Sequence, residues 1–229
     1  MVDTEQVKKA VVFFLTGMEK VSSFAETISP LCTIITVFMK VLKEGLKDDL
    51  AIAEYKKVDE DFSAIHTKLD TISQTNQKLL TEIKLDEVKV TYGKHENYIK
   101  LQYTAFIEMV EKIKKNPDDS QKYMEEFKVM DKYELEKGLK VFYRGICEEP
   151  GFGRPLLDVY FEHCDGNKTI METRCSHIIN LFNMGLMALM ARTAIKGGDK
   201  NEVEKKWGRM VKEMKDEMMV WLEKCNRPN

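Results

Sequence analysis

Hydrophobic side chains recur alternately three and four residues apart through the second quarter of the chain. The positions run from Tyr55 to Ile83 in steps of 3, 4, 3, 4, 3, 4, 3 and 4, which is the a/d pattern of a helix that packs along one seam. Neither Gly nor Pro occurs from Leu46 to Tyr92. The pattern therefore predicts one long helix over residues 47–92, about 65–70 Å long at 1.5 Å per residue. The seam residues that we expect to make helix contacts are Val58, Phe62, Ile65, Leu69, Ile72, Asn76, Leu79 and Ile83.

Asn76 is a polar residue within this apolar seam. A buried Asn at such a position lowers stability but fixes the register and the partner of a helix pair. This interpretation predicts a specified helix pairing, made either within the chain or between two chains. The alternative is that Asn76 lies partly exposed at the edge of a bundle, because a stripe at helical spacing is more often plain core.

Residues 1–46 are the most apolar part of the N-terminal half and predict a pair of helices. Apolar residues recur at helical spacing over Val7–Val21, and an almost unbroken apolar run covers Leu31–Leu42. Ser29 can cap a helix, and Pro30 fits the first turn of one. These two residues therefore predict the joint between the helices.

The rest of the chain also follows helical periods. Gly93 predicts a turn or a kink, and amphipathic stripes predict helices over 95–143. Gly and Pro residues mark 144–155 as a loop, and 156–225 predict the C-terminal helices. Within these, Ile178–Ala191 contains no charge; the stretch is shorter than the roughly 20 residues that span a bilayer, so we expect a central buried helix.

Together these elements predict an all-α fold. We expect one domain over residues 1–229, a bundle of six to eight helices around the long heptad-patterned helix. Gly 12 and Pro 5 are both low counts for a strand-and-turn protein, which supports the helical interpretation.

The predicted loop offers a candidate contact site. Phe152 lies between two glycines and Arg154 follows, and a rigid loop that presents an aromatic ring and a guanidinium can dock a partner. The alternative is that Phe152 folds inward and fills a gap in the core.

Charge and cysteine usage narrow the function classes. The formal net charge is −2 and no basic stripe occurs, so nucleic acid is not an expected partner. The five cysteines do not form a spaced framework, and the short apolar run at Ala10–Leu15 lacks the features of a signal peptide. We therefore expect a reduced, cytoplasmic protein, with peripheral membrane association as the alternative.

Candidate chemistry is sparse. His163, Cys164, Cys175 and His177 are the best metal-ligand types, in two short pairs. Helical neighbours one or two residues apart diverge by about 100–200°, so neither pair converges on an ion. Cys175 and His177 lie on different faces of one helix, which disfavours a nucleophile–base pair. We expect no catalytic residue, no metal and no cofactor.

Three segments resemble the rapunzel family, found in fish. They are "GRPLLDVYFEHCDGNKTIMETRCSHIINLFNMGLMALMARTAI" from Gly153, "VDEDFSAIHTKLDTISQTNQKLL" from Val58 and "YIKLQYTAF" from Tyr98. The resemblance covers most of the chain and is most specific over 153–195. It implies no enzymatic activity, cofactor or catalytic residue.

Two function classes follow. The first is a non-enzymatic bundle that binds a protein partner or self-associates into an oligomer, using the coiled-coil seam. The second is a membrane-associating, pore-forming bundle whose apolar N-terminal helices open at a hinge, which resembles membrane-perturbing helical bundles in architecture alone. The residues that the second class would use are Phe14, Pro30, Ile34, Ile35 and Phe38.

Overall fold

The computed structural model describes residues 4–44, 48–81, 86–130, 132–147 and 154–225, with side chains except those of residues 4, 79–81, 132 and 133. Within these residues the chain is helical and contains no strand, which confirms the all-α prediction. The elements in chain order are α1 Thr4–Gly17, the 3₁₀ helix η1 Val21–Ser23, α2 Ile28–Glu44, α3 Asp49–Thr81, α4 Asp86–Lys115, the 3₁₀ helix η2 Pro117–Asp119, α5 Ser120–Lys128, α6 Lys132–Cys147, α7 Leu156–Glu162, α8 Lys168–Lys196 and α9 Lys200–Lys224.

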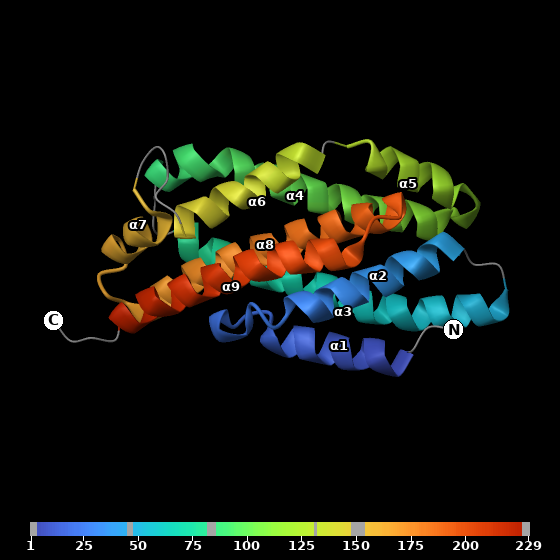
Figure 1. Cartoon of the computed structure of the whole chain (residues 1–229), viewed down its shortest axis with the longest axis horizontal. Helices are drawn as coiled ribbons and strands as arrows, with labels where there is room; N and C mark the ends of the chain where they lie inside the picture. The colour runs from blue at the N-terminus through green and yellow to red at the C-terminus, as the bar shows by residue number, and fades with distance from the viewer. Residues whose placement is uncertain (1–3, 45–47, 82–85, 131, 148–153, 226–229) are drawn as a thin grey trace.

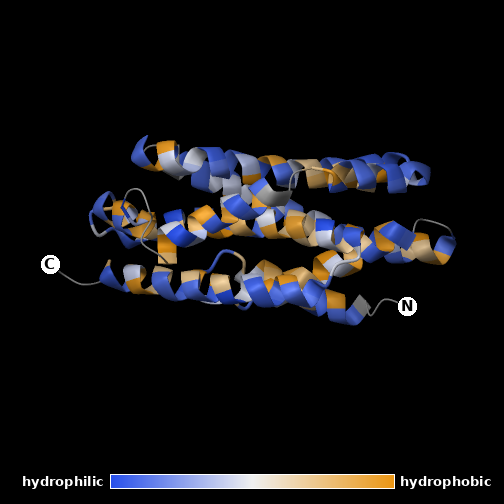
Figure 2. Cartoon of the chain, turned by 45° about the horizontal axis from the view of Figure 1, so that its top comes forward, coloured by the Kyte–Doolittle hydropathy of each residue, from blue (hydrophilic) through white to orange (hydrophobic). Residues whose placement is uncertain are grey.

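Helix α8 forms the centre of the bundle. It packs against α2, α3, α4, α6 and α9, which surround it (Figure 1). Every residue from Ile178 to Arg192 is buried, as a helix covered on all sides requires. Hydrophilic and hydrophobic residues alternate along the outer helices instead (Figure 2). The prediction of a central buried helix is confirmed.

By length and composition α8 is, within the described part of the chain, the one helix apolar enough to cross a membrane. Most of that stretch is buried inside the fold. A core helix passes the same test, so this property assigns no membrane span.

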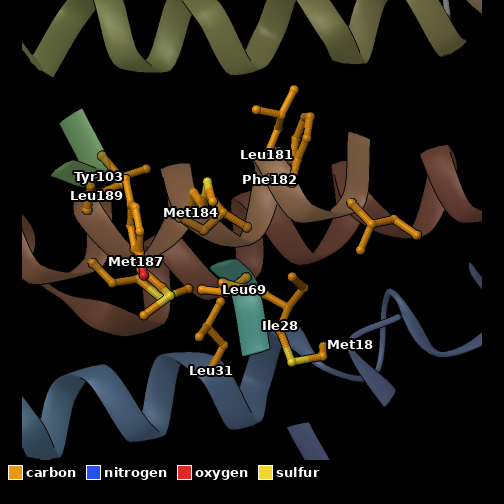
Figure 3. Packing of buried hydrophobic residues seen from close by; sticks show 14 of the residues in the cluster. Met18, Ile28, Leu31, Leu69, Tyr103, Leu181, Phe182, Met184, Met187 and Leu189 are labelled. Carbon is orange, nitrogen blue, oxygen red and sulfur yellow. The ribbon is translucent and has the colours of Figure 1, made fainter. Parts of the chain in front are cut away.

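The core is built from side chains of many helices. Leu31 of α2, Leu69 of α3 and Met187 of α8 meet in its interior (Figure 3). The rings of Phe38 and Phe62 stack with centroids 4.2 Å apart, and Phe106 packs edge-on against Phe62. Such aromatic pairs fix the spacing of α2, α3 and α4.

The prediction of one helix over residues 47–92 is wrong. Helix α3 ends at Thr81 and α4 begins at Asp86, and the two helices run antiparallel, because Asp59 pairs with Lys114 and His66 with Tyr103. Helix α4 shows the same spacing of buried residues in a shifted register, because both helices bury one face on α8. Periodicity reports which face is buried, and a reversal of chain direction leaves it intact.

Gly93, predicted as a turn or a kink, lies inside α4. A Cβ atom there would meet only the Cγ atom of Lys89, at 3.6 Å. The helix therefore continues through Gly93, at a cost of about 1 kcal/mol in helix propensity.

The joint of the N-terminal helix pair lies earlier than predicted. Helix α1 ends at Gly17 and α2 begins at Ile28, so Pro30 occupies the first turn of α2, whereas Ser29 lies inside it. The chain turns back against Gly17, whose Cβ position is 3.0 Å from Thr27 and 3.1 Å from Ser23. A larger residue at position 17 would therefore force Thr27 or Ser23 to move by a few tenths of an ångström.

Two boundaries in the C-terminal half also differ. The stretch 95–143, predicted to hold helices, contains most of α4, all of α5 and most of α6, and the described residues hold nine α-helices, one more than the upper estimate. Helix α6 continues to Cys147, so residues 144–147 of the predicted loop are helical. Asn167 caps α8 by accepting the Ile170 N–H, and Gly197 ends it in the left-handed conformation.

Candidate functional site: the groove between α3 and α4

The predicted seam lies inside its own chain. The seam side chains from Val58 to Asn76 are all buried against neighbouring helices, at 0–5% exposed. The side chain of Leu79 and all of Ile83 lie outside the described residues. The pairing that the seam specifies is therefore within the chain, and a charged residue at Leu69 would disrupt the core rather than an external interface.

Asn76 and its neighbours connect α3 to α8. The Asn76 Nδ2 atom lies 3.4 Å from Ser176 Oγ. One turn away, Asn180 donates to Ser73 Oγ at 2.7 Å and to the Leu69 carbonyl at 3.4 Å. These bonds fix how α3 lies on α8, because a shift in register would leave buried amides unpaired. Asn76 is 5% exposed, so it is not an edge residue.

A groove of about 630 Å³ lies on the outer side of this seam, between α3 and α4. One wall is a single stripe of α3 from His66 to Gln77, and the other is a stripe of α4 from Lys100 to Lys115. Tyr103, Ile107 and Met184 form its apolar floor, and Met184 comes from α8. Tyr103 and Met184 are labelled in Figure 3. The groove thus has an apolar base between two polar helical walls.

The floor of the groove includes a buried tyrosine, Tyr103. His66 Nδ1 and the Tyr103 hydroxyl lie 2.6 Å apart, and His66 Nε2 lies 3.9 Å from Asp70. Burial, followed by the negative charge of Asp70, raises the pKa of Tyr103 well above its usual range. Tyr103 therefore stays a neutral partner for His66, which suits a binding surface.

The rim is charged but balanced. Three acids and three lysines line it. Lys100 already binds Glu96 at 2.6 Å, and Lys112 approaches Glu126 at 3.7 Å. A rim with both signs does not attract a polyanion. The acids are Asp70, Glu108 and Glu111, and the lysines are Lys100, Lys112 and Lys115.

The predicted loop contact is only partly described. Phe152 lies outside the described residues. Arg154 is exposed, but its guanidinium pairs with Asp158 at 2.8 Å and with Glu162 at 2.5 Å. These ion pairs keep Arg154 along α7, so its charge is engaged within its own chain.

The side chains named for membrane insertion lie in the core. Phe14, Ile34, Ile35 and Phe38 are each at most 1% exposed. Pro30 lies in the first turn of α2 and not in the connection between α1 and α2. Insertion through these residues would require α1 and α2 to leave the bundle.

The structure brings Cys164 and Cys175 close enough to interact electrostatically, together with Cys225, whereas His163 and His177 have other partners. The His163 ring contacts the Val159 carbonyl, and the Cys164 thiol donates to the Phe161 carbonyl. His177 Nε2 lies 3.1 Å from Glu96 on α4, and burial raises the pKa of Cys175 to about 12. Within the described residues, no group of three or more His, Cys, Asp or Glu side chains could hold a metal ion.

Parts of the groove follow patterns that are visible in the sequence. Tyr103 and Ile107 belong to the predicted stripe over 95–143, and His66 reads as an ordinary helix-surface or seam residue. Nothing in the pattern connects them with Met184 of α8. The missing information is the spacing of three helices, which local periodicity does not carry.

The fold and the groove define an all-α bundle with a helix-lined surface site. The chain belongs to the family of the cephalotoxin-like middle helical domain, whose family model matches residues 51–228. It is similar to the zebrafish (Danio rerio) protein rapunzel, with 27% identity over an alignment of 227 residues that covers 97% of this chain and 96% of that protein. The resemblance to the rapunzel family is thereby confirmed. No solved structure matches the chain.

Proposed function

We propose that this protein acts without catalysis, by binding an amphipathic helix of a protein partner in the groove between α3 and α4. The observation that carries the proposal is the apolar floor of Tyr103, Ile107 and Met184 between two polar helical walls. An apolar centre with a polar rim is the usual anatomy of a protein interface. A helix laid into such a groove is a recurring form of recognition.

The dimensions of the groove support a helical occupant. The α3 wall from His66 to Gln77 covers about 16 Å, and the α4 wall from Lys100 to Lys115 about 22 Å, at 1.5 Å per residue. Three to four turns of a helix match that length. A third helix packs naturally onto two antiparallel helices, because its ridges enter the groove between them.

The charges of the rim support a protein partner of mixed charge. With three acids and three lysines, the rim would meet opposite charges along a partner helix and set its orientation. Exposed ion pairs contribute little affinity, about 0–1 kcal/mol each. The affinity would therefore come from the apolar stripe of the partner on the floor.

The test places a photoreactive benzoylphenylalanine at Gln77, in the groove wall, and at Arg209 on α9 as a control. Both positions are exposed. We expect the Gln77 probe to cross-link to a peptide with apolar residues at i, i+3, i+4 and i+7. A synthetic copy of that peptide should then bind the purified protein and gain helicity on binding.

Matched variants locate the contact. Thr104→Arg places a long charged side chain at an exposed position that lines the groove, whereas Thr75→Arg makes the same change at an exposed position of α3 outside it. We expect Thr104→Arg to weaken binding of the peptide at least tenfold, with Thr75→Arg unchanged. Equal binding by both variants, or cross-links to a second copy of this chain, would contradict the proposal.

A further inference from the structure

A second pocket of about 630 Å³ lies where the C-terminal ends of α2 and α8 meet the N-terminal end of α9. It shares no lining residue with the groove between α3 and α4. Cys32 and Met190 line its inner end and are buried, at 1% and 4% exposed. Ala194 and Val203 add half-buried apolar walls. The Cys32 thiol lies 3.9 Å from the Lys200 carbonyl and interacts with the Glu204 carboxylate. The part of the interior suited to an apolar group is therefore the side lined by Met190, Ala194 and Val203.

The mouth of the pocket is positively charged. Lys40, Lys43 and Lys200 line it together with Glu44 and Asp199, so the three lysines outnumber the two acids. Glu44 pairs with Lys40 at 3.8 Å, and the Asp199 carboxylate accepts the Asn201 N–H at 2.8 Å as the cap of α9.

Lys43 and Lys200 keep their charges available. Lys43 Nζ donates to the Ala194 carbonyl at 3.1 Å, which holds the ammonium at the mouth and leaves further protons to donate. Neither lysine has a carboxylate partner within the described part of the chain. Two ammonium groups thus flank an opening that leads to an apolar interior.

We propose that this pocket binds a fatty acid, with its carboxylate between Lys43 and Lys200 and its hydrocarbon chain toward Met190 and Val203. The chemistry of the pocket suits both parts of such a ligand. A free inorganic anion would leave the apolar interior unfilled, and a neutral hydrocarbon would leave the lysines unpaired. The volume lies within the range of about 300–1,000 Å³ that is usual for small-molecule sites.

The direct test is competition on the full-length protein. The probe is 11-(dansylamino)undecanoic acid, whose fluorescence increases in an apolar site. We expect dodecanoate to displace it, dodecanol to displace it at least tenfold more weakly, and inorganic phosphate not to displace it. Decanoate should bind on the order of tenfold more weakly than dodecanoate, because each buried methylene changes affinity about fourfold.

Variants assign the site to this pocket. Lys43 and Lys200 are exposed, so the double change Lys43→Gln and Lys200→Gln leaves the core intact. We expect it to weaken dodecanoate binding at least tenfold, while Lys212→Gln, on an exposed stretch of α9, has no effect. Ala194→Phe should also weaken binding, because its ring enters the pocket wall.

Three results would overturn the proposal. Displacement by phosphate as effective as that by dodecanoate would indicate a simple anion site. Equal displacement by dodecanol and dodecanoate would indicate an apolar site without a role for the lysines. Unchanged binding by the double lysine variant would place the probe elsewhere. None of these results bears on the groove between α3 and α4, since the two sites are separate.

Discussion

Two glycines in the described helices offer a test of how closely the bundle packs. Gly185 lies in the middle of α8 and Gly208 in α9. A Cβ atom at Gly185 would lie 2.8 Å from Leu139 Cδ2 and 3.2 Å from Ile99 Cγ2, whereas one at Gly208 meets no atom within 4 Å. The same substitution, Gly→Ala, should therefore have opposite effects at the two positions.

The magnitudes follow from two opposing contributions. Replacing Gly by Ala in a helix gains about 1 kcal/mol of stability through helix propensity. At Gly185 the new methyl group is opposed by Leu139 and Ile99, which are fully buried and cannot swing into solvent, and overpacking costs about 1–3 kcal/mol. We expect Gly208→Ala to stabilise by about 1 kcal/mol and Gly185→Ala to destabilise by about 1 kcal/mol.

The assay is urea unfolding followed by circular dichroism at 222 nm. The dependence of the unfolding free energy on urea should be the same for all variants, so that shifts in midpoint report stability alone. Gly93→Ala is a useful third variant, because only Lys89 Cγ, at 3.6 Å, approaches that position; it should stabilise like Gly208→Ala. If Gly185→Ala stabilised as much as Gly208→Ala, the close approach of α8 to α4 and α6 would be refuted.

Two further predictions concern pH and membranes. Burial alone would raise the pKa of Glu96, but its hydrogen bonds and ion pairs with His177 and Lys100 outweigh burial and lower the pKa from 4.5 to about 2. The stability that these interactions add is present above pH 4.5 and is lost as the pH falls toward 2. Acid titration monitored by thermal unfolding should thus show a smaller loss of stability from pH 5 to pH 2.5 in Glu96→Gln, which at pH 7 should cost about 1–3 kcal/mol. At neutral pH we expect no dye release from anionic liposomes, because Phe14 and Phe38 are buried; release would instead make the opening of α1 and α2 part of the function.

Much of the fold could be predicted from the sequence, because amphipathic helices record their buried faces. The seam from Val58 to Asn76 and the charge-free stretch Ile178–Ala191 are both buried as expected. The chain reversal between α3 and α4 could not be predicted. Neither Gly nor Pro occurs from Leu46 to Tyr92. The apolar pattern does change register, to Tyr92, Ile99 and Phe106, but such a shift also occurs within continuous helices.

The glycines are a second example of structural roles that the sequence does not distinguish. Gly17 ends α1 at a turn, where the side chain of Thr27 comes to 3.0 Å from the Cβ position. At Gly93 the helix simply continues, and at Gly185 the glycine lets another helix approach. These three roles look identical in the sequence, since they differ only in which distant side chain comes close.

The candidate site was the hardest part to predict, because its residues do not differ from ordinary solvated faces. Asp70 and Gln77 occupy polar positions on α3, as any amphipathic helix requires. They become walls of a groove only because α4 returns antiparallel beside α3 and Met184 of α8 closes the floor. The seam residues, which dominate the sequence pattern, are buried in the contacts that build this arrangement. A partner would therefore contact the polar positions of α3 that flank the seam, and not the seam residues themselves.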